Sequence, residues 1–248
     1  MNLSSTKPPY LTVFCPLFKG SKFIQGYMEN MVEQTIFKDV KFHILDCNSP
    51  EKEVEVIEKF LGYNNIYYER LDNDPGLYEA WNICCKKADT DLVGNWNVDD
   101  RKSPWSLEAL LQPFLLDENL DIAYGPTFVS EKANETWGQI KNPRIFPCNE
   151  TLTWKDLIMN NSPHCMPIWK RSIHDKFGYF DTSYETAADS DMWIRAVKSG
   201  ASIKKISDVV GIYYHNPQGR STQPATLKKM LDEVHGMRKK HCPEYTVN

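Results

Sequence analysis

Strand-like and helix-like segments alternate along the first hundred residues, and this alternation constrains the fold more than any other feature of the sequence. Short apolar runs typical of buried strands occur at 11–15, 41–46, 66–71 and 91–98. Helical segments separate them, at 22–37, at 49–61 with Ser49 and Pro50 at its start, and at 78–88. Because consecutive parallel strands need such crossovers, the pattern predicts an α/β fold with a mainly parallel central sheet and helices on both faces.

The length and charge of the chain restrict its size class and its partners. With 248 residues, 41% of them hydrophobic, it can bury the core of one large domain or of two closely packed halves. We expect a single domain. The net charge of −4 gives no electrostatic reason for a nucleic-acid partner.

The sequence lacks several features that would indicate a membrane-spanning or secreted protein. No apolar run reaches the length of a membrane-spanning helix, and the first ten residues lack the pattern of a signal peptide. Seven cysteines, an odd number, show no zinc or disulfide spacing. We therefore expect a soluble cytoplasmic protein, or one that associates peripherally with a membrane, without an integral membrane segment.

Carboxylates follow the fourth apolar run, in the stretch "GNWNVDDRKSP". In open sheets of this kind ligands bind outside the carboxyl ends of the strands, where the direction of the crossovers changes. Asp99 and Asp100 would lie at that edge, where acidic side chains can hold a hard divalent cation and, through it, substrate phosphates. An ordinary turn between a strand and a helix is the alternative for such a cluster.

A second acidic position comes from the segment "ETAADSDMWIRAVKSG". Its apolar residues form one stripe of a helix, and Asp189 lies three and four residues before two of them, Met192 and Trp193. Asp189 therefore projects from the first turn on the buried side, where it either borders a cleft or caps the helix. Asp191 has Arg195 four residues later, which predicts a helical ion pair.

Five segments stand in the order and approximate spacing of the family 2 glycosyltransferases, which are inverting enzymes of GT-A fold. They are "LTVFCPLFKG", "FHILDCNSPE", "DNDPGLYEAWNICCKKADTD", "NWNVDDR" and "YETAADSDMWIRAVKSG". The resemblance extends from about residue 9 to residue 221. It implies a nucleotide-sugar-binding half (about 9–102), an acceptor-binding and catalytic half (103–221), and a C-terminal helix and tail (222–248).

The resemblance also implies the chemistry. A sugar would pass from a nucleotide-sugar donor, expected to be a UDP-sugar, to a hydroxyl of a glycan or glycoconjugate, with Mn²⁺ or Mg²⁺ as cofactor. Asp189 falls at the position of the general base. The implied donor-binding residues are Pro16, Phe18, Asp46, Asn48, Asp99 and Arg220. The implied metal ligands are Asp99, Asp100 and His215.

The chain departs from the family pattern at two positions. Cys47 replaces an acidic residue beside the base, and Ala188 replaces the glutamate that often precedes the general base. His215 is equally well read as a polar surface residue and Phe18 as a core aromatic, whereas His164 is read as a structural or cleft residue in preference to a metal ligand. Two other functions stay open: a nucleotidyltransferase, which needs no base at Asp189, and a catalytically inactive nucleotide- or carbohydrate-binding module.

Overall fold

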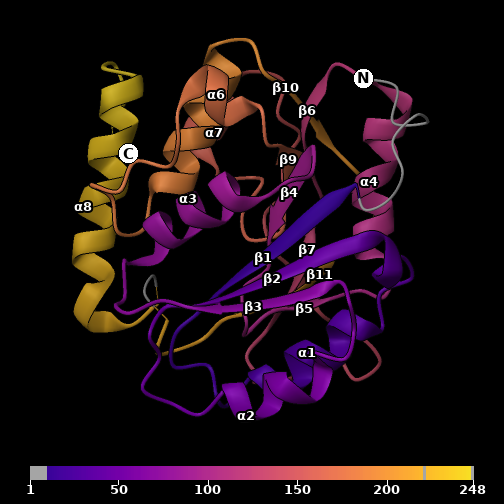
Figure 1. The fold of residues 1–248 in the computed structure, drawn as a ribbon. Coiled ribbons are helices and arrows are strands. Elements are labelled where there is room, and N and C mark those ends of the chain that lie inside the picture. The colour runs from indigo at the N-terminus through magenta and orange to yellow at the C-terminus, as the bar shows by residue number, and fades with distance from the viewer. Residues whose placement is uncertain (1–9, 220–221, 247–248) are drawn as a thin grey trace.

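The computed structural model describes residues 10–219 and 222–246. Its central sheet has seven strands in the order β10-β6-β9-β4-β1-β2-β3 (Figure 1). These strands are β1 (Leu11–Leu17), β2 (Val40–Asp46), β3 (Ile66–Arg70), β4 (Leu92–Asn95), β6 (Leu120–Tyr124), β9 (Ile168–Lys170) and β10 (Ser202–Lys205). Only β9 runs antiparallel to its neighbours, β4 and β6. The predicted mainly parallel α/β sheet is confirmed.

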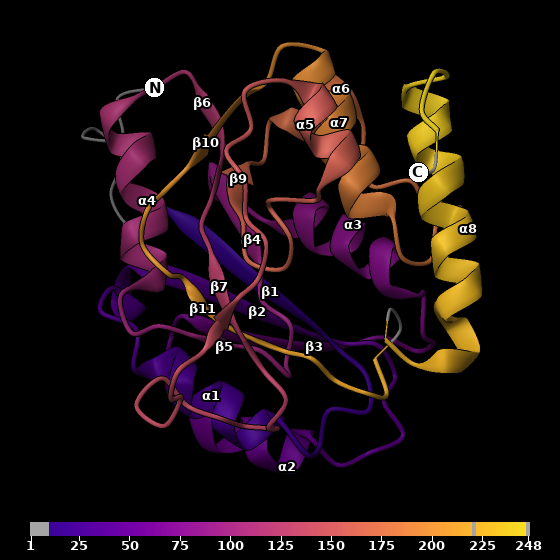
Figure 2. The same cartoon turned by 180° about the vertical axis from the view of Figure 1, so that it is seen from behind.

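Helices cover both faces of this sheet, as predicted, and the views in Figures 1 and 2 agree on their grouping. One hydrophobic core includes side chains of α1 (Ile24–Val32), α2 (Val54–Ile57) and α4 (Ser106–Leu116). The other includes those of α3 (Leu77–Lys87), α5 (Trp154–Met159), α6 (Ile173–Phe177), α7 (Ala188–Lys198) and α8 (Pro224–His241). The short 3₁₀ helices are η2 (Phe37–Asp39) and η3 (Glu58–Phe60).

The central strands are apolar on both sides because each face is covered. In β1, Val13 packs into the core that includes α1. The next residue, Phe14, packs into the core on the opposite face, against Trp81 of α3. Successive side chains of a strand point to opposite faces, so a strand buried on both faces needs a continuous apolar run. This is why the alternation of apolar runs and helices predicted the sheet.

A smaller sheet of four strands lies beside the central one, in the order β5-β11-β7-β8. Its strands are β5 (Arg101–Lys102), β7 (Thr127–Ser130), β8 (Arg144–Ile145) and β11 (Gly211–Tyr214). Both views place β5, β7 and β11 together (Figures 1 and 2). β5 directly follows Asp100 and pairs antiparallel with β11, so residues about 110 positions apart meet at this point. This second sheet was not predicted from the sequence.

The predicted second helix is wrong at its start. It begins at Val54, not at Ser49 and Pro50, and its N-cap is Glu53. The Ser49 hydroxyl instead donates to Glu53 Oε1 at 2.8 Å, so it does not cap the helix. The first helix is also shorter than predicted, and β4 ends at Asn95, which leaves the aspartate pair in a turn beyond the strand.

The C-terminal helix α8 is anchored to α7 by one buried carboxylate. Asp191 is fully buried and accepts hydrogen bonds from Arg195 Nε at 2.6 Å and from His241 Nε2 at 2.8 Å. Lys240 Nζ lies 3.2 Å from the same carboxylate. The predicted Asp191–Arg195 pair is thus confirmed, and α8 adds Lys240 and His241 as further partners of Asp191. Within the described part of the chain, no helix is both long enough and apolar enough to cross a bilayer.

Candidate active site

The polar side chains predicted to bind a donor gather at the carboxyl ends of β1, β2 and β4. β1 lies between β2 and β4 and is parallel to both. The chain crosses from β1 to β2 on one side and later returns to β4 on the other, so β1 and β4 flank the topological switch point. Ligands of open α/β sheets bind at such a point.

Phe18 lies in the loop that follows β1. Its ring is 39% exposed, which contradicts the core-aromatic interpretation, and the Lys19 ammonium lies 5.2 Å from the ring centroid. The loop after β2 holds this loop in place. Ser49 Oγ accepts a hydrogen bond from the Lys19 amide at 3.0 Å, and Glu53 Oε1 accepts one from the Gly20 amide at 2.7 Å. Pro16, half-buried in β1, precedes this loop.

Asp46 and Asn48, at the end of β2, are both bound to Arg70 at the end of β3. Asp46 is buried and accepts hydrogen bonds from the Ser49 amide and the Tyr68 hydroxyl, each at 2.7 Å. One guanidinium nitrogen of Arg70 donates to Asp46, and the other donates to Asn48 Oδ1 at 3.0 Å. Asn48 has φ +58°, a left-handed conformation that asparagine tolerates. Asp46 and Asn48 were both predicted from the sequence as donor-binding residues, but Arg70 was not.

Cys47 points away from these polar groups and into the core. It is 3% exposed and belongs to the apolar cluster that contains Phe14, Leu45 and Trp81. Its backbone N–H donates to Leu17 O at 2.9 Å, which ties the ends of β1 and β2 together. A carboxylate at this position would be buried among apolar side chains, so the position serves packing in this chain.

Asp100 is held by the last residue of β11, and Asp99 by the loop that follows this strand. Asp100 is 1% exposed, and its Oδ1 accepts a hydrogen bond from the backbone N–H of Tyr214 at 3.0 Å. Asn97 Nδ2 donates to the other oxygen of Asp100 at 3.2 Å. Asn216 Nδ2 donates to Asp99 Oδ2 at 3.3 Å. These hydrogen bonds from distant residues distinguish the pair from a plain surface turn.

Burial and mutual repulsion destabilise the charged forms of Asp99 and Asp100. Burial, followed by the charge of Asp99, raises the pKa of Asp100 to about 8. Burial also raises the pKa of Asp99. Among the described residues, no lysine or arginine forms an ion pair with either carboxylate. Two adjacent carboxylates with hard oxygen donors and no counter-ion fit a divalent cation such as Mg²⁺ or Mn²⁺.

His215 lies between the two residues that contact the aspartate pair, Tyr214 and Asn216. Its side chain is exposed, and its backbone N–H donates to Ser130 O at 2.8 Å. Within residues 10–219 and 222–246, no three His, Cys, Asp or Glu side chains come close enough to form a metal site. His215 therefore lies beside two residues that contact the pair but is not assembled with the pair into a ligand set. Arg220 falls outside the described residues.

Asp189 lies in the first turn of α7, as predicted, and both of its oxygens are occupied. Tyr78 Oη donates to Oδ1 at 3.0 Å, and Asn161 Nδ2 donates to Oδ2 at 2.7 Å. The N-cap of α7 is Ala187, so Asp189 does not hold the N-cap position. Burial raises the pKa of Asp189, although hydrogen bonds from Asn161, the Ser190 backbone and Tyr78 oppose the shift.

The polar partners of the predicted carboxylates were missed in the sequence. Tyr78, Asn161 and Asn216 come from α3, from the turn before β9 and from the loop after β11. Tyr78 follows the "DPGL" turn that opens α3, and this was the one local signal that pointed toward the site. Asn161 and Asn216 sit in irregular segments, where nothing in the sequence indicates which carboxylate they meet.

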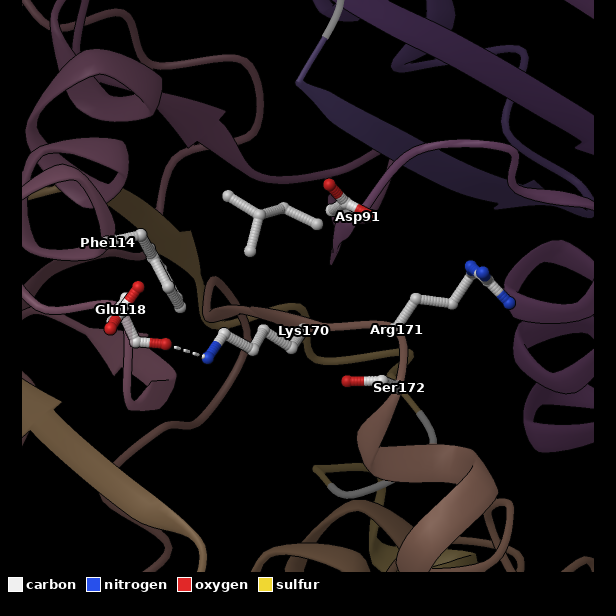
Figure 3. Close-up of a pocket in the computed structure, with 7 residues that line it drawn as sticks. Asp91, Phe114, Glu118, Lys170, Arg171 and Ser172 are labelled. Carbon is white, nitrogen blue, oxygen red and sulfur yellow. Dashed lines mark hydrogen bonds between the residues drawn. The ribbon is translucent and has the colours of Figure 1, made fainter. Parts of the chain in front are cut away.

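A separate small cavity lies at the start of β4, opposite the carboxyl ends of the parallel strands (Figure 3). It has a volume of about 70 Å³ and is lined by residues at the start of β4 and the end of β9, among them Asp91, Lys170 and Arg171. Lys170 Nζ donates there to the backbone of Glu118. None of the predicted site residues lines this cavity.

Residues 12–177 match the model of the family described as glycosyl transferase family 2. The chain belongs to that family. Every strand of the switch point and the Asp99–Asp100 pair fall within the match, whereas Asp189 lies after its end. Membership places the chain in the glycosyltransferase class of enzymes, which supports neither a nucleotidyltransferase nor a catalytically inactive nucleotide- or carbohydrate-binding module.

A curated relative and several solved structures resemble the chain. An uncharacterized glycosyltransferase of Bacillus subtilis (strain 168), YwdF, is 24% identical over 223 residues, which cover 85% of this chain and 78% of YwdF. The structure of S. aureus TarS 1–349 with UDP-GlcNAc has a TM-score of 0.72 at 16% identity and covers 96% of this chain. The chain spans 68% of that structure, 66% of TarS 1–349 and 40% of a longer TarS structure.

A second solved structure of similar fold is the mannosyltransferase PcManGT from Pyrobaculum calidifontis with GDP-Man and Mn²⁺. Its TM-score is 0.70 at 15% identity, and the superposition covers 98% of this chain and 67% of that one. Because the solved structures are all of low identity, they show the GT-A glycosyltransferase fold and leave the substrates of this chain open.

Proposed function

We propose that this chain transfers a sugar from a nucleoside-diphosphate sugar to an acceptor hydroxyl, with inversion at the anomeric carbon. The observation that carries the proposal is the environment of Asp189. Its carboxylate is oriented by Tyr78 and Asn161, is largely withdrawn from water, and does not occupy the N-cap position of α7. A half-buried carboxylate with a raised pKa is suited to accept a proton.

The proposed transfer is a single displacement at the anomeric carbon. The acceptor oxygen forms a bond to the anomeric carbon while the bond from that carbon to the diphosphate oxygen breaks. The electron pair of the broken bond leaves on the diphosphate, and the hydroxyl proton passes to a carboxylate oxygen of Asp189. Attack from the face opposite the leaving group inverts the anomeric centre.

The donor would bind at the switch point. Phe18 offers an exposed ring for the base, and Asp46, Asn48 and Arg70 offer a fixed set of donors and acceptors beside it. A UDP-sugar is the donor we propose, in keeping with the bound UDP-GlcNAc of a structure of the same fold. A divalent cation held by Asp99 and Asp100 would stabilise the negative charge of the diphosphate.

Replacing the base tests the proposal. Asp189→Asn keeps the size of the side chain but cannot accept the proton. We expect donor and metal binding to persist and the rate of sugar transfer to fall by roughly 10²- to 10⁴-fold, the usual contribution of a positioned base. Donor affinity is measured by calorimetry, the transfer rate by release of the nucleoside diphosphate, and the anomeric configuration of the product by NMR.

Asp175→Asn is the matched control, since Asp175 lies in the first turn of α6 but is exposed. It should transfer at the wild-type rate. Normal turnover by Asp189→Asn, or a product that retains the anomeric configuration of the donor, would refute Asp189 as the base of an inverting reaction.

A further inference from the structure

The turn from Asn161 to His164 connects the proposed base to the aspartate pair. The His164 amide donates to Asn161 O at 3.2 Å, which closes the turn. At one end, Asn161 bonds to Asp189. At the other, the His164 ring lies 4.7 Å from that of Tyr213, whose neighbour Tyr214 holds Asp100 through its backbone N–H. The turn therefore contacts the proposed base at one end and, at the other, packs on β11, the strand that holds Asp100.

The amide of Asn161 has only one possible orientation. Its Nδ2 must face the carboxylate of Asp189, because Oδ1 in that position would repel an acceptor. Oδ1 is thereby fixed on the other side of the amide, where it is buried and has no hydrogen-bond partner among the described residues. A buried acceptor without a donor is costly, and in a native structure it calls for a missing partner.

His164 has two unusual features. Its φ of +46° places a non-glycine residue in the left-handed region, and such strain is concentrated at functional sites. Its ring stacks on Phe146 with centroids 3.8 Å apart and 17° between the planes. Nδ1 is buried without a partner among the described residues. Burial lowers the pKa of His164 to about 4, so the ring is neutral near pH 7.

We propose that this turn is the acceptor site and that it selects a neutral sugar through a hydroxyl vicinal to the attacking one. The attacking hydroxyl bonds to Asp189, the vicinal hydroxyl donates to Asn161 Oδ1, and the apolar face of the sugar ring packs on the cluster of Phe146, His164 and Tyr213. This inference rests on the proposed function and adds to it the class of acceptor.

Two features of the site favour a neutral vicinal diol. Asn161 Oδ1 belongs to the same amide group that touches the base, so it can reach only a hydroxyl next to the attacking one. An acceptor carboxylate or phosphate at this position would lie beside the carboxylate of Asp189, which disfavours anionic sugars. Neutral aromatic rings provide flat apolar surface for the carbon-bound hydrogens of a sugar face.

The test separates acceptor recognition from donor chemistry. Release of UDP from UDP-sugars is measured without acceptor and with methyl glycosides of glucose, galactose, mannose and N-acetylglucosamine, and with methyl glucuronide. Once the linkage of the product is known, the glycoside lacking the vicinal hydroxyl is compared with its parent. We expect wild type to lose roughly 5- to 100-fold in kcat/KM with the deoxy acceptor, as an unpaired buried acceptor implies.

In Asn161→Ala the two acceptors should differ by less than about 2-fold, because the group that distinguishes them is gone. Asn160→Ala is the matched control: its amide bonds to Pro147 O and Ser162 Oγ, so discrimination should stay at the wild-type level. His164→Gly relieves the left-handed strain and should fold. It should raise the acceptor KM, whereas the acceptor KM of Asn160→Ala should stay at the wild-type value.

Each contrary result has a distinct meaning. Undiminished discrimination in Asn161→Ala, a preference for methyl glucuronide, or an unchanged acceptor KM in His164→Gly would overturn the acceptor proposal while the proposed transferase function stood. If no neutral glycoside accelerates UDP release although wild type hydrolyses a donor, the neutral acceptor is also excluded. Failure of wild type to bind or hydrolyse any UDP- or GDP-sugar would overturn the proposed function itself.

Discussion

The charged form of Asp100 is poorly stabilised by the folded chain itself. It is buried next to Asp99, and its strongest local support is the backbone N–H of Tyr214. Asp100→Asn keeps an oxygen for that N–H and removes the repulsion. We expect metal-dependent donor affinity to fall at least 10-fold, while the melting temperature without metal stays the same or rises.

Calorimetric titration of UDP with and without Mn²⁺ measures the first effect, and thermal unfolding measures the second. Asp91→Asn at the other end of the same strand is the control, because it lies away from the pair. Wild-type donor affinity with unchanged metal dependence in Asp100→Asn would remove the metal from this position.

Cys47 gives the second prediction at the scale of a residue. The sequence suggested that an acidic residue here would restore a contact to the base, but the thiol packs against the apolar cluster of Phe14 and Trp81. Cys47→Asp should lower the free energy of unfolding by about 1–3 kcal/mol and should not strengthen UDP binding. Chemical denaturation and UDP titration measure the two quantities, and Cys47→Ala is the control. Tighter UDP binding in Cys47→Asp would show that the side chain reaches the base.

The sequence indicated the carboxylates of the site better than their partners. Asp99, Asp100 and Asp189 follow or begin regular elements, so their positions could be inferred from periodicity and from the edge of a parallel sheet. Asn161 and Asn216 belong to irregular segments, and their contacts span 28 and 117 positions of the chain. No local pattern encodes contacts of that range.

At the scale of elements, α7 and α8 are joined through Asp191. Burial alone would raise the pKa of this carboxyl, but hydrogen bonds from His241 and Arg195 and the charge of Lys240 together hold it well below the ordinary value. A carboxyl whose pKa is lower in the folded state stabilises the fold above its unfolded pKa, near 4, and that stability is lost as the pH falls.

Asp191→Asn should therefore lower the free energy of unfolding by about 3–5 kcal/mol at pH 7, as expected when a buried ion pair loses one partner. The difference from wild type should persist down to about pH 5 and shrink below pH 4. Urea denaturation across this range measures it, with exposed Asp232→Asn on α8 as the control. A difference that is independent of pH would mean that packing, and not charge, joins the two helices.

Elements with strong periodicity were predicted well, and those set by tertiary contacts were not. α3 and α7 lie close to their predicted ranges because an apolar stripe and end signals agree. The second helix was misplaced because Ser49 and Glu53 serve the loop after β1, a use that the local cap pattern does not reveal. Strands β5, β7, β8 and β11 are two to four residues long, too short for a pattern of period two.

For the whole molecule, ligand binding should increase the thermal stability of the folded chain. A ligand that binds only the folded chain adds about 2.7 kcal/mol at a concentration of 100 Kd. We expect UDP with Mn²⁺ to raise the melting temperature by several degrees, more than UDP or Mn²⁺ alone, since the cation and the diphosphate share a site. GDP with Mn²⁺ is the comparison in the same thermal scan. A larger shift with GDP would assign the base pocket to guanine, and equal shifts with and without Mn²⁺ would argue against a shared metal site.

The topology of the central sheet has a consequence for how the chain is made. β9 lies between β4 and β6, yet its residues follow those of β4 by about 75 positions, which take roughly 4–15 s to synthesise. During that interval, strands β1 to β4 can pair while one side of β4 still offers unmatched backbone groups to any neighbouring chain. We therefore expect nascent chains that stop between β4 and β9 to associate with chaperones or aggregate, and chains extended past β9 to escape this fate.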